Sequence, residues 1–388
     1  MNPLRVFILA GEPSGDKLGG ALMAGLKALH PDVQFEGIGG VQMQAEGLVS
    51  RFDMSELSVM GLAEILPKYR HLKRRIAQTA QAVIDSQPDV LITIDSPDFS
   101  LRVAKLVKEG STVRTVHYVA PTVWAWRAGR AAKMARHIDQ VLALLPFEPP
   151  YMQAAGMRCD FVGHPVVAEP VATDAQADEF RATIGVNDAP LMLVLPGSRT
   201  SEVSRLGARF GDVVRRLHSE HPDLHFVVPA AAPVADAVAA LTTAWPATTV
   251  LDPRQGAYTD AMTQKRAAFK AADVALAASG TVSLELAAAN TPMVIAYDMS
   301  PLSRFVISRM VKIDTVTLVN LVSDSRVVPE FIGKACQPPQ IARAVSEVLA
   351  EPDAQRAAMA LTMQRLGQGG EAPGVRAARA VLDGLAQG

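Results

Sequence analysis

Two carboxylates follow directly after a short apolar segment. Residues 90–94 are four apolar residues and one threonine, and Asp95 and Asp98 come within the next four positions. Because such a strand in a doubly wound α/β sheet ends at the ligand-binding edge, both carboxylates are candidates for a catalytic site. Asp95 is nearer the strand end, and burial there would raise its proton affinity, so it is our candidate general base. The alternative is that Asp95 or Asp98 caps the following helix.

A Gly/Ser turn, AGEPSGD at residues 10–16, follows the first apolar segment. Its two glycines lie four positions apart, which fits neither the GxGxxG fingerprint nor a GxxxxGK[ST] loop and disfavours a dehydrogenase or a P-loop ATPase. Glu12, Ser14 and Asp16 are the polar side chains that this turn would direct at a ligand above the sheet. The alternative is a tight turn in which Ser14 or Asp16 caps a helix.

The second half of the chain contains two further turns of this kind. Ser279, Gly280 and Thr281 join an apolar segment to a helix, so their amides and hydroxyls would cradle a diphosphate. Glu285 lies one turn into that helix, where its carboxylate can accept both hydroxyls of a ribose. Arg199, in the other turn, can hold phosphate charge in a forked contact.

Each of these residues also has a purely structural interpretation. Ser279 could cap its helix, Glu285 could favour the helix dipole, and Arg199 could pair with Glu202 at the surface. The presence of both turns in one half of the chain favours a nucleotide site.

Two tryptophans, an arginine and a histidine in the first half of the chain are further candidate site residues. Trp124 and Trp126 lie beside Arg127 in one predicted loop. Indole rings of this kind stack on sugar faces or pack in a core. His164, between a glycine and a proline, could touch a substrate or fix a hinge, and we favour the hinge. We count all four among the candidate residues of the acceptor side or the cleft.

An apolar helical stripe is followed by a cluster of cations. This pattern is typical of a helix that rests on an anionic bilayer surface, although a solvated helix packed on the sheet has the same pattern. The predicted membrane-facing residues are Val59, Leu62 and Leu66 on the stripe and Lys68, Arg70, Lys73 and Arg74 in the basic cluster.

The amino-acid composition excludes several classes of protein. The chain of 388 residues has 49% hydrophobic and 20% charged residues, which is typical of folded rather than disordered proteins. Its 38 Lys and Arg residues balance 39 Asp and Glu residues, which argues against a general nucleic-acid binder. There is no HExxH, HxH or Asp-x-Asp pattern, and Cys159 and Cys336 form no CxxC pair. The sequence therefore predicts no metal site, no cofactor and no disulfide scaffold.

Eight short apolar segments alternate with amphipathic helical patterns along the whole chain. This alternation is typical of an α/β fold with parallel sheets and right-handed crossovers. The predicted buried strands are 6–10, 90–94, 115–119, 141–145, 191–195, 226–228, 274–278 and 294–297.

A proline-containing stretch without periodicity follows residue 165, and we place the domain boundary there. We expect an N-terminal domain at 1–165, a C-terminal domain at 166–349, and helices at about 350–388 that pack back on the first domain. No segment approaches the ~20 consecutive apolar residues that span a bilayer, and the first strand is not followed by a signal-peptide cleavage pattern. The expected location is the cytoplasm or the cytoplasmic face of a membrane.

These motifs follow one order along the chain and together resemble the lipid-A-disaccharide synthase family. The segments that carry the resemblance are 10–16, 59–62, 94–99, 118–127, 145–148, 161–165, 195–199 and 278–285. The resemblance implies a glycosyltransferase B fold, in which an acceptor-binding and a UDP-sugar-binding Rossmann-like domain face a central cleft. It also implies an inverting transfer of 2,3-diacylglucosamine from UDP to the 6-hydroxyl of 2,3-diacylglucosamine 1-phosphate, giving a β(1→6) disaccharide phosphate and UDP.

The resemblance further implies roles for individual residues. Asp95 matches the base that takes the proton from the acceptor's 6-hydroxyl. The residues that match positions associated with UDP are Arg199, Gln255, Ser279, Gly280, Thr281, Glu285 and Asn320. Next to Asn320 the pattern departs from the family, which commonly has proline where Val319 stands here.

The implied partners are UDP-2,3-diacylglucosamine, 2,3-diacylglucosamine 1-phosphate, an anionic membrane surface and a second copy of the chain in a homodimer. Peripheral attachment to the cytoplasmic face of the inner membrane follows from these acylated substrates. Two alternatives stay open. A UDP-N-acetylglucosamine 2-epimerase would use the same fold and cradle, and a regulatory module would only bind UDP or lipid.

Overall fold

The computed structural model describes residues 3–57, 62–125, 129–299 and 313–387. The chain divides into two compact units: unit 1, Met1–Ala168 with Leu366–Gly388, and unit 2, Glu169–Arg365. Three of the predicted site residues lie outside the described residues, namely Val59, Trp126 and Arg127. Three more lie in a helix at positions whose side chains are not described, namely Leu62, Leu66 and Lys68.

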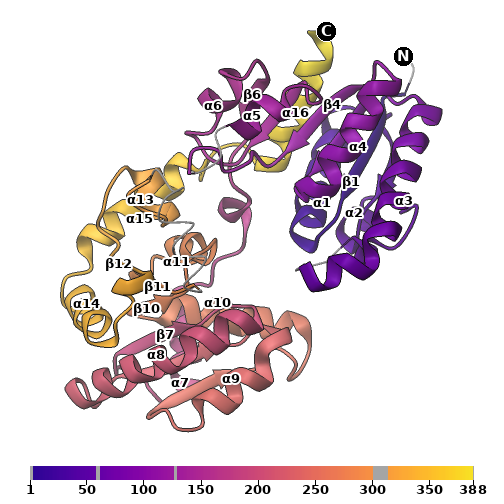
Figure 1. Ribbon diagram of the computed structural model, residues 1–388. Coiled ribbons are helices and arrows are strands. Elements are labelled where there is room, and N and C mark those ends of the chain that lie inside the picture. Colours follow the sequence, from indigo (N-terminus) through magenta and orange to yellow (C-terminus); the bar gives the residue numbers. More distant parts are fainter. Residues whose placement is uncertain (1–2, 58–61, 126–128, 300–312, 388) are drawn as a thin grey trace. The chain divides into compact units, whose positions relative to one another are not determined.

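Unit 1 (Figure 1) is built on a parallel six-stranded sheet. The strand order is β2-β1-β3-β4-β5-β6. Its strands are β1 (Arg5–Ala10), β2 (Gln34–Ile38), β3 (Val90–Ile94), β4 (Arg114–Tyr118), β5 (Gln140–Ala143) and β6 (Arg158–Phe161). The strand order reverses between β1 and β3. In open α/β sheets this switch point is where ligands bind, outside the carboxyl ends of the strands.

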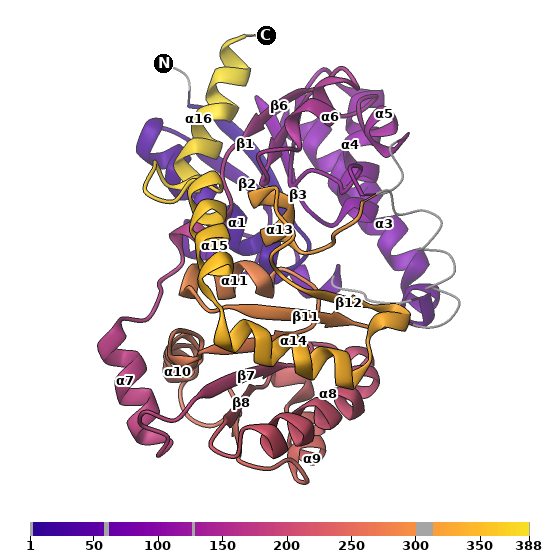
Figure 2. The same ribbon diagram turned by 90° about the vertical axis from the view of Figure 1, so that its left-hand side faces the viewer.

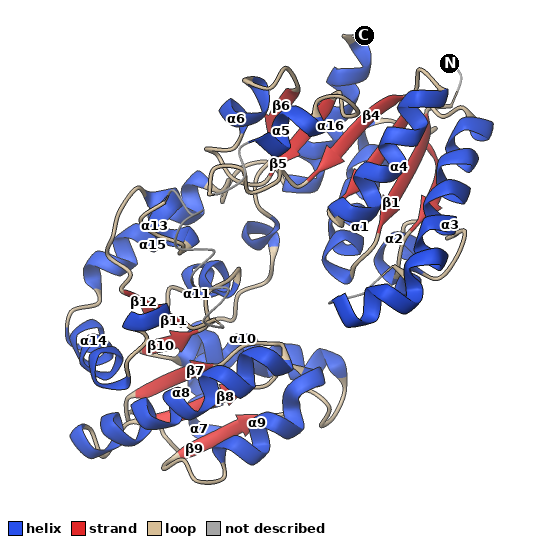
Figure 3. Cartoon of the chain, in the orientation of Figure 1, coloured by secondary structure: helices blue, strands red, loops and turns tan. Residues whose placement is uncertain are grey.

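Helices cover both faces of this sheet, and the central strands are buried along most of their length (Figure 3). The helices of unit 1 are α1 (Pro13–Leu29), α2 (Val41–Ala45), α3 (Leu62–Ser86), α4 (Pro97–Gly110), α5 (Gly129–Met134), α6 (Pro149–Gln153) and α16 (Pro373–Ala386). On β1, Ile8 belongs to the cluster that includes Leu22 of α1 and Val381 of α16. The preceding residue of β1, Phe7, belongs to the other cluster, which includes Val103 of α4.

The C-terminal helix α16 packs along α1 within unit 1 (Figure 2). Their contact is close enough that a β-carbon at Gly25 would lie 2.5 Å from the carbonyl oxygen of Gly374. The chain enters this unit again at Leu366, whereas α15 (Asp353–Arg365) packs on α11 and α13 of unit 2. The segment that returns to unit 1 is therefore shorter than the 350–388 expected from the sequence.

Unit 2 has a second parallel six-stranded sheet, with the order β12-β11-β10-β7-β8-β9. Its strands are β7 (Leu191–Leu195), β8 (His225–Pro229), β9 (Thr248–Leu251), β10 (Val274–Ala277), β11 (Met293–Tyr297) and β12 (Glu330–Ile332). Its other helices are α7 (Asp174–Thr183), α8 (Thr200–Glu220), α9 (Ala235–Thr242), α10 (Tyr258–Ala271), α11 (Val282–Ala289), α13 (Leu318–Ser323) and α14 (Pro338–Ala350).

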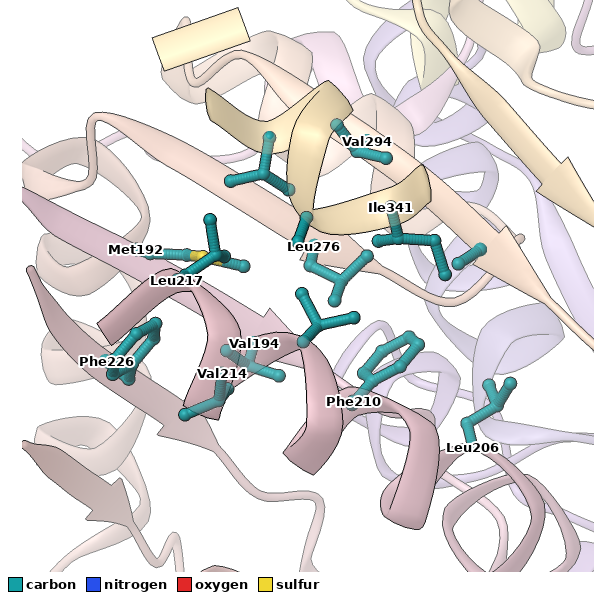
Figure 4. Close-up of a cluster of buried hydrophobic side chains, with 14 of the residues drawn as sticks. Met192, Val194, Leu206, Phe210, Val214, Leu217, Phe226, Leu276, Val294 and Ile341 are labelled. Atoms are coloured by element: carbon teal, nitrogen blue, oxygen red, sulfur yellow. The ribbon is translucent and has the colours of Figure 1, made fainter. Parts of the chain in front are cut away.

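One face of this sheet packs against α8 and α14. Figure 4 shows Val194 of β7 and Leu276 of β10 facing Phe210 of α8 and Ile341 of α14, and all four are fully buried. Two parallel α/β units are thus present, and the predicted class of two Rossmann-like domains is confirmed. Within the part of the chain that the structure describes, no helix combines the length and the apolar character needed to cross a membrane.

Candidate functional site

A pocket of about 650 Å³ opens at the carboxyl ends of four strands of unit 2. It is lined by the residues that follow β7, β8, β9 and β10 and by one side of α10. This is the edge at which Rossmann-like sheets bind nucleotides, and the volume is that of a small-molecule site. Five of the predicted nucleotide residues line it together: Arg199, Ser279, Gly280, Thr281 and Glu285.

In the first turn of the pocket, between β7 and α8, the backbone amides already donate hydrogen bonds to a carboxylate of the protein. Glu202 accepts hydrogen bonds from the amides of Ser198, at 3.0 Å, and Arg199, at 3.3 Å. The Arg199 guanidinium also donates to Glu202, at 3.0 Å, although this arginine side chain is 61% exposed. Gly197 is required here because it has φ of +120° and a β-carbon would lie 2.5 Å from Glu202. The surface pairing of Arg199 with Glu202 that the sequence left open is therefore present.

The second turn presents its backbone to the pocket. Gly280 and Thr281 are exposed at the start of α11, and the Ser283 hydroxyl donates to the Gly280 carbonyl at 2.9 Å. The amides at a helix start carry partial positive charge, so this end of α11 suits an anionic group. One turn further, Glu285 is half-buried and its carboxylate is 2.6 Å from the ammonium of Lys265 on α10.

Two predicted nucleotide residues do not line this pocket. Gln255 is exposed in the turn after β9, next to the lining residues Asp252 and Pro253. Asn320 is 1% exposed, and its amide donates to the Val328 carbonyl at 2.9 Å and accepts from the Val328 amide at 3.0 Å. These bonds tie α13 to the segment before β12. The predicted UDP contacts of Gln255 and Asn320 stay predictions.

In unit 1, Asp95 lies in a strained turn between β3 and α4. Asp95 and Ser96 both have left-handed backbone conformations, with φ of 48° and 44°. Two consecutive residues of this kind store strain, which is common at functional sites. The turn is held by the Asp95 amide, which donates to the Tyr118 carbonyl at 3.0 Å. Because Ser96, not Asp95, stands at the N-cap of α4, Asp95 is not used as the cap of this helix.

The turn at Gly11 lies against the Asp95 turn, as expected at the switch point. A β-carbon on Gly11 would lie 2.7 Å from the Ser96 hydroxyl oxygen. Glu12 is half-buried beside it and Ser14 is exposed. Asp98 is exposed in the first turn of α4, where its charge favours the helix dipole.

Asp16 stabilises the start of a helix, whereas the sequence left open whether it binds a ligand or caps a helix. Its carboxylate is buried and accepts hydrogen bonds from the amides of Gly40, at 2.7 Å, Gln42, at 2.9 Å, and Met43, at 3.1 Å. These amides belong to the start of α2, so Asp16 caps a helix other than its own. It fixes the loop after β2 beside the switch point.

Glu148 is a buried carboxyl that sequence reasoning missed. It is 3% exposed and accepts hydrogen bonds from the Leu145 amide, at 3.0 Å, and the Trp124 indole, at 3.4 Å. Burial raises the pKa of Glu148 to about 7. The Trp124 ring also packs edge-on against Phe147, with centroids 5.2 Å apart. The available signal was an acidic residue at the end of a run of otherwise apolar residues.

His164 and His117 have different surroundings. The amide of His164 donates to the Leu366 carbonyl at 3.2 Å, and its ring nitrogen accepts from the Val166 amide at 3.2 Å. These contacts join the two segments that connect the units, which supports the hinge interpretation. His117 is buried in β4 with its ring 2.7 Å from the Thr93 hydroxyl, and burial lowers its pKa to about 4.

The basic part of α3 contains one arginine in a forked ion pair and three exposed cations, of which Arg74 lies 3.0 Å from the ring of His71. Arg75 makes a forked contact with Glu56, at 2.9 and 2.8 Å, and its guanidinium lies 4.3 Å from the centre of the Phe52 ring. Arg70, Lys73 and Arg74 are exposed. Residues 70–75 of α3 therefore combine one structural arginine, Arg75, with three cations at the surface.

The two parallel six-stranded α/β units define a fold of the glycosyltransferase B type. Solved structures with the same fold include UDP-N-acetylglucosamine 2-epimerase from Neisseria meningitidis bound to UDP-GlcNAc, with a TM-score of 0.62, 11% identity and 100% coverage of both chains. Another is HepE from Anabaena in complex with UDP and glucose, with a TM-score of 0.56 and 13% identity over 98% of this chain and 99% of that one.

Sequence comparison specifies the family. Residues 6–380 match the family model described as lipid-A-disaccharide synthetase. Lipid-A-disaccharide synthase from Ruegeria pomeroyi is 66% identical over 98% of this chain and 96% of its own length, and that from Rhodospirillum centenum is 46% identical over 99% and 95%. The chain belongs to the lipid-A-disaccharide synthase family, and it is a glycosyltransferase of lipid A biosynthesis. The resemblance inferred from the motifs is confirmed.

Proposed function

We propose that this chain transfers 2,3-diacylglucosamine from UDP-2,3-diacylglucosamine to the 6-hydroxyl of 2,3-diacylglucosamine 1-phosphate. The products are the β(1→6) disaccharide 1-phosphate and UDP. Membership of the family supports a disaccharide synthase in general. The observation that carries the nucleotide part is the convergence of Arg199 and the 279–285 segment on one pocket at the strand ends of unit 2.

The proposed donor site follows the chemistry of these residues. The diphosphate lies at the start of α11, where the amides of Gly280 and Thr281 carry partial positive charge. Arg199 is exposed at the same pocket and adds a permanent positive charge beside the phosphates. Glu285 accepts the ribose hydroxyls one turn further along the helix. The helix-start amides and Arg199 balance the negative charge that develops on UDP as it leaves.

The proposed reaction is a single inverting displacement. The oxygen of the acceptor's 6-hydroxyl attacks the anomeric carbon, the bond from that carbon to the UDP oxygen breaks, and Asp95 takes the hydroxyl proton. A base must keep a fixed direction toward this proton, because misplacement by about an ångström is costly in rate. The paired left-handed residues Asp95 and Ser96, held by Tyr118, supply that rigidity.

The acylated substrates lead to a proposal about location and assembly. We propose that the protein attaches peripherally to the cytoplasmic face of the inner membrane and acts as a homodimer. The three exposed cations Arg70, Lys73 and Arg74 support attachment to an anionic surface, where each adds on the order of 1 kcal/mol.

Product analysis tests the reaction and its base. Purified protein is incubated with both substrates and EDTA, and labelled products are separated by thin-layer chromatography. We expect a disaccharide band from the wild type and a loss of about a hundredfold or more in rate in Asp95→Asn, because general-base catalysis contributes 10²–10⁴-fold. Asp98→Asn is the matched control, since this neighbouring carboxylate is exposed and its loss tests whether it shares the role.

Four outcomes contradict the proposal. No disaccharide from the wild type discards the synthase reaction, and UDP release without disaccharide favours an epimerase. UDP binding without turnover, unchanged by Asp95→Asn, favours a regulatory module. If only Asp98→Asn loses activity, the base is misassigned.

A further inference from the structure

Lys265 and Glu285 form an ion pair within the unit 2 pocket. Both side chains line the pocket, their charged atoms are 2.6 Å apart, and they are 34% and 37% exposed. The lysine comes from the second turn of α10 and the glutamate from the first turn of α11. A direct contact between two helices thus lies on the wall of the site.

The lysine is held from two sides. Its ammonium contacts the Oε2 oxygen of Glu285 and lies 5.0 Å from the centre of the Phe269 ring, one helical turn further along α10. Phe269 is itself buried and lines the pocket. Lys265 therefore occupies a defined place, and it restricts the rotation of the glutamate that it contacts.

The contact involves only one of the two carboxylate oxygens of Glu285. Oε2 accepts from Lys265, and each carboxylate oxygen has a second lone pair for a further donor. Two neighbouring hydroxyls of a ribose need both oxygens at once, in one plane. A carboxylate fixed through one oxygen is oriented before the nucleotide arrives, which lowers the entropic cost of binding.

We infer that Lys265 is a positioning residue that orients the Glu285 carboxylate for the vicinal hydroxyls of the nucleotide and so makes the pocket selective for ribonucleotides over deoxyribonucleotides. This inference rests on the proposed donor site. It predicts an effect on the choice of sugar, whereas a lysine that binds phosphate would change the affinity for ribo- and deoxyribonucleotides equally.

The test is calorimetric binding of UDP and of 2′-deoxy-UDP to the same protein preparations. We expect the wild type to prefer UDP by about tenfold or more, the usual cost of losing a hydrogen bond to a charged group. In Lys265→Met the preference should fall below about threefold, because the carboxylate is no longer held. Lys265→Arg retains the positive charge and should keep most of the preference.

Lys270→Met is the matched control. This lysine lies on the same helix and is also ion-paired, at 3.0 Å to Asp174, but it does not line the pocket. It should keep the wild-type preference. Because each preference is a ratio measured within one preparation, partial unfolding of a variant lowers the active fraction without changing the ratio.

Two results overturn the inference while leaving the donor site intact. An unchanged preference in Lys265→Met means that the lysine only packs, and an equal loss of affinity for both nucleotides means that it binds phosphate. Failure of the wild type to bind UDP overturns the donor site and the inference together.

Discussion

The buried carboxyl of Glu148 makes the stability of unit 1 depend on pH in a specific direction. Burial raises its pKa from 4.5 to about 7 in the folded chain. Between these values the folded state holds a proton that the unfolded state releases, so the free energy of unfolding falls as the pH rises through this window. The shift corresponds to a stabilisation of about 3 kcal/mol at low pH. Nearly all of this stabilisation is lost by the time the pH reaches 7.

Replacing Glu148 by Gln removes the titration. Relative to the wild type, Glu148→Gln should gain about 3 kcal/mol in unfolding free energy between pH 4.5 and pH 8. The amide oxygen can still accept from Leu145, while the bond from Trp124 is weakened, and this loss adds an offset that does not vary with pH. The slope of the difference with pH is therefore the quantity that reports the pKa.

Urea unfolding at intervals between pH 4.5 and pH 8 measures this slope. Trp245 lies in unit 2 and the other two tryptophans, at positions 124 and 126, lie in unit 1, so a Trp245→Phe background restricts the fluorescence signal to unit 1. Glu148→Met removes both acceptors and should change the offset but keep the slope. A difference between wild type and Glu148→Gln that is constant across this pH range would refute the reasoning.

Burial, close backbone packing and surface charge elsewhere in unit 1 lead to three more predictions. His117→Asn should gain about 3 kcal/mol over the wild type as the pH falls from 6.5 to 4, because burial lowers the pKa of His117 to about 4 and the folded wild type resists protonation. Gly374→Ala should lower unfolding free energy by about 1–3 kcal/mol, since its β-carbon would overlap the α1 backbone. Changing Arg70, Lys73 and Arg74 to Gln should weaken sedimentation with anionic vesicles by about a hundredfold.

Each of these has its own control. For His117, urea unfolding that shows the same pH dependence in variant and wild type would contradict the lowered pKa. For Gly374, thermal unfolding of Gly129→Ala serves as the comparison, because a β-carbon there meets nothing within 4 Å. For the three cations, zwitterionic vesicles should bind wild type and variant equally weakly, and equal binding to anionic vesicles would place the membrane surface elsewhere.

The central strands were predictable because of where they lie in the sheets. All eight strands predicted from apolar segments are central ones, whereas the four that were missed, β2, β6, β9 and β12, are the edges of the two sheets. A central strand is covered on both faces, so its sequence is mostly apolar, as in β3 with four apolar residues of five. An edge strand is partly solvated, so its sequence includes polar residues, as in QFEGI of β2 and RCDF of β6. A search for continuous apolar segments therefore misses it.

Within the site, predictability depended on sequence distance. The 279–285 segment is local, since a strand end, a turn and one helical turn fix the positions of Ser279 and Glu285. Pairs that depend on tertiary packing could not be predicted. Lys265 meets Glu285 across 20 positions and Trp124 meets Glu148 across 24, and nothing in either local pattern specifies its partner. Sequence patterns therefore located the groups, and packing decided which of them interact.

The two turns of the unit 2 pocket illustrate this difference, because the sequence predicted a diphosphate cradle at 279–281 and only a side-chain contact from Arg199 at the other turn. At α8 the amides of Ser198 and Arg199 already donate to Glu202, so the anion at that helix start is part of the protein. At α11 the corresponding residues, Gly280 and Thr281, are exposed to the pocket, and the acidic residue Glu285 is turned toward Lys265 on the neighbouring helix. A diphosphate placed at α8 would have to displace a carboxylate and meet its charge. The start of α11 carries no such penalty, which supports the proposed placement of the phosphates there and a role for the side chain of Arg199 rather than its amide.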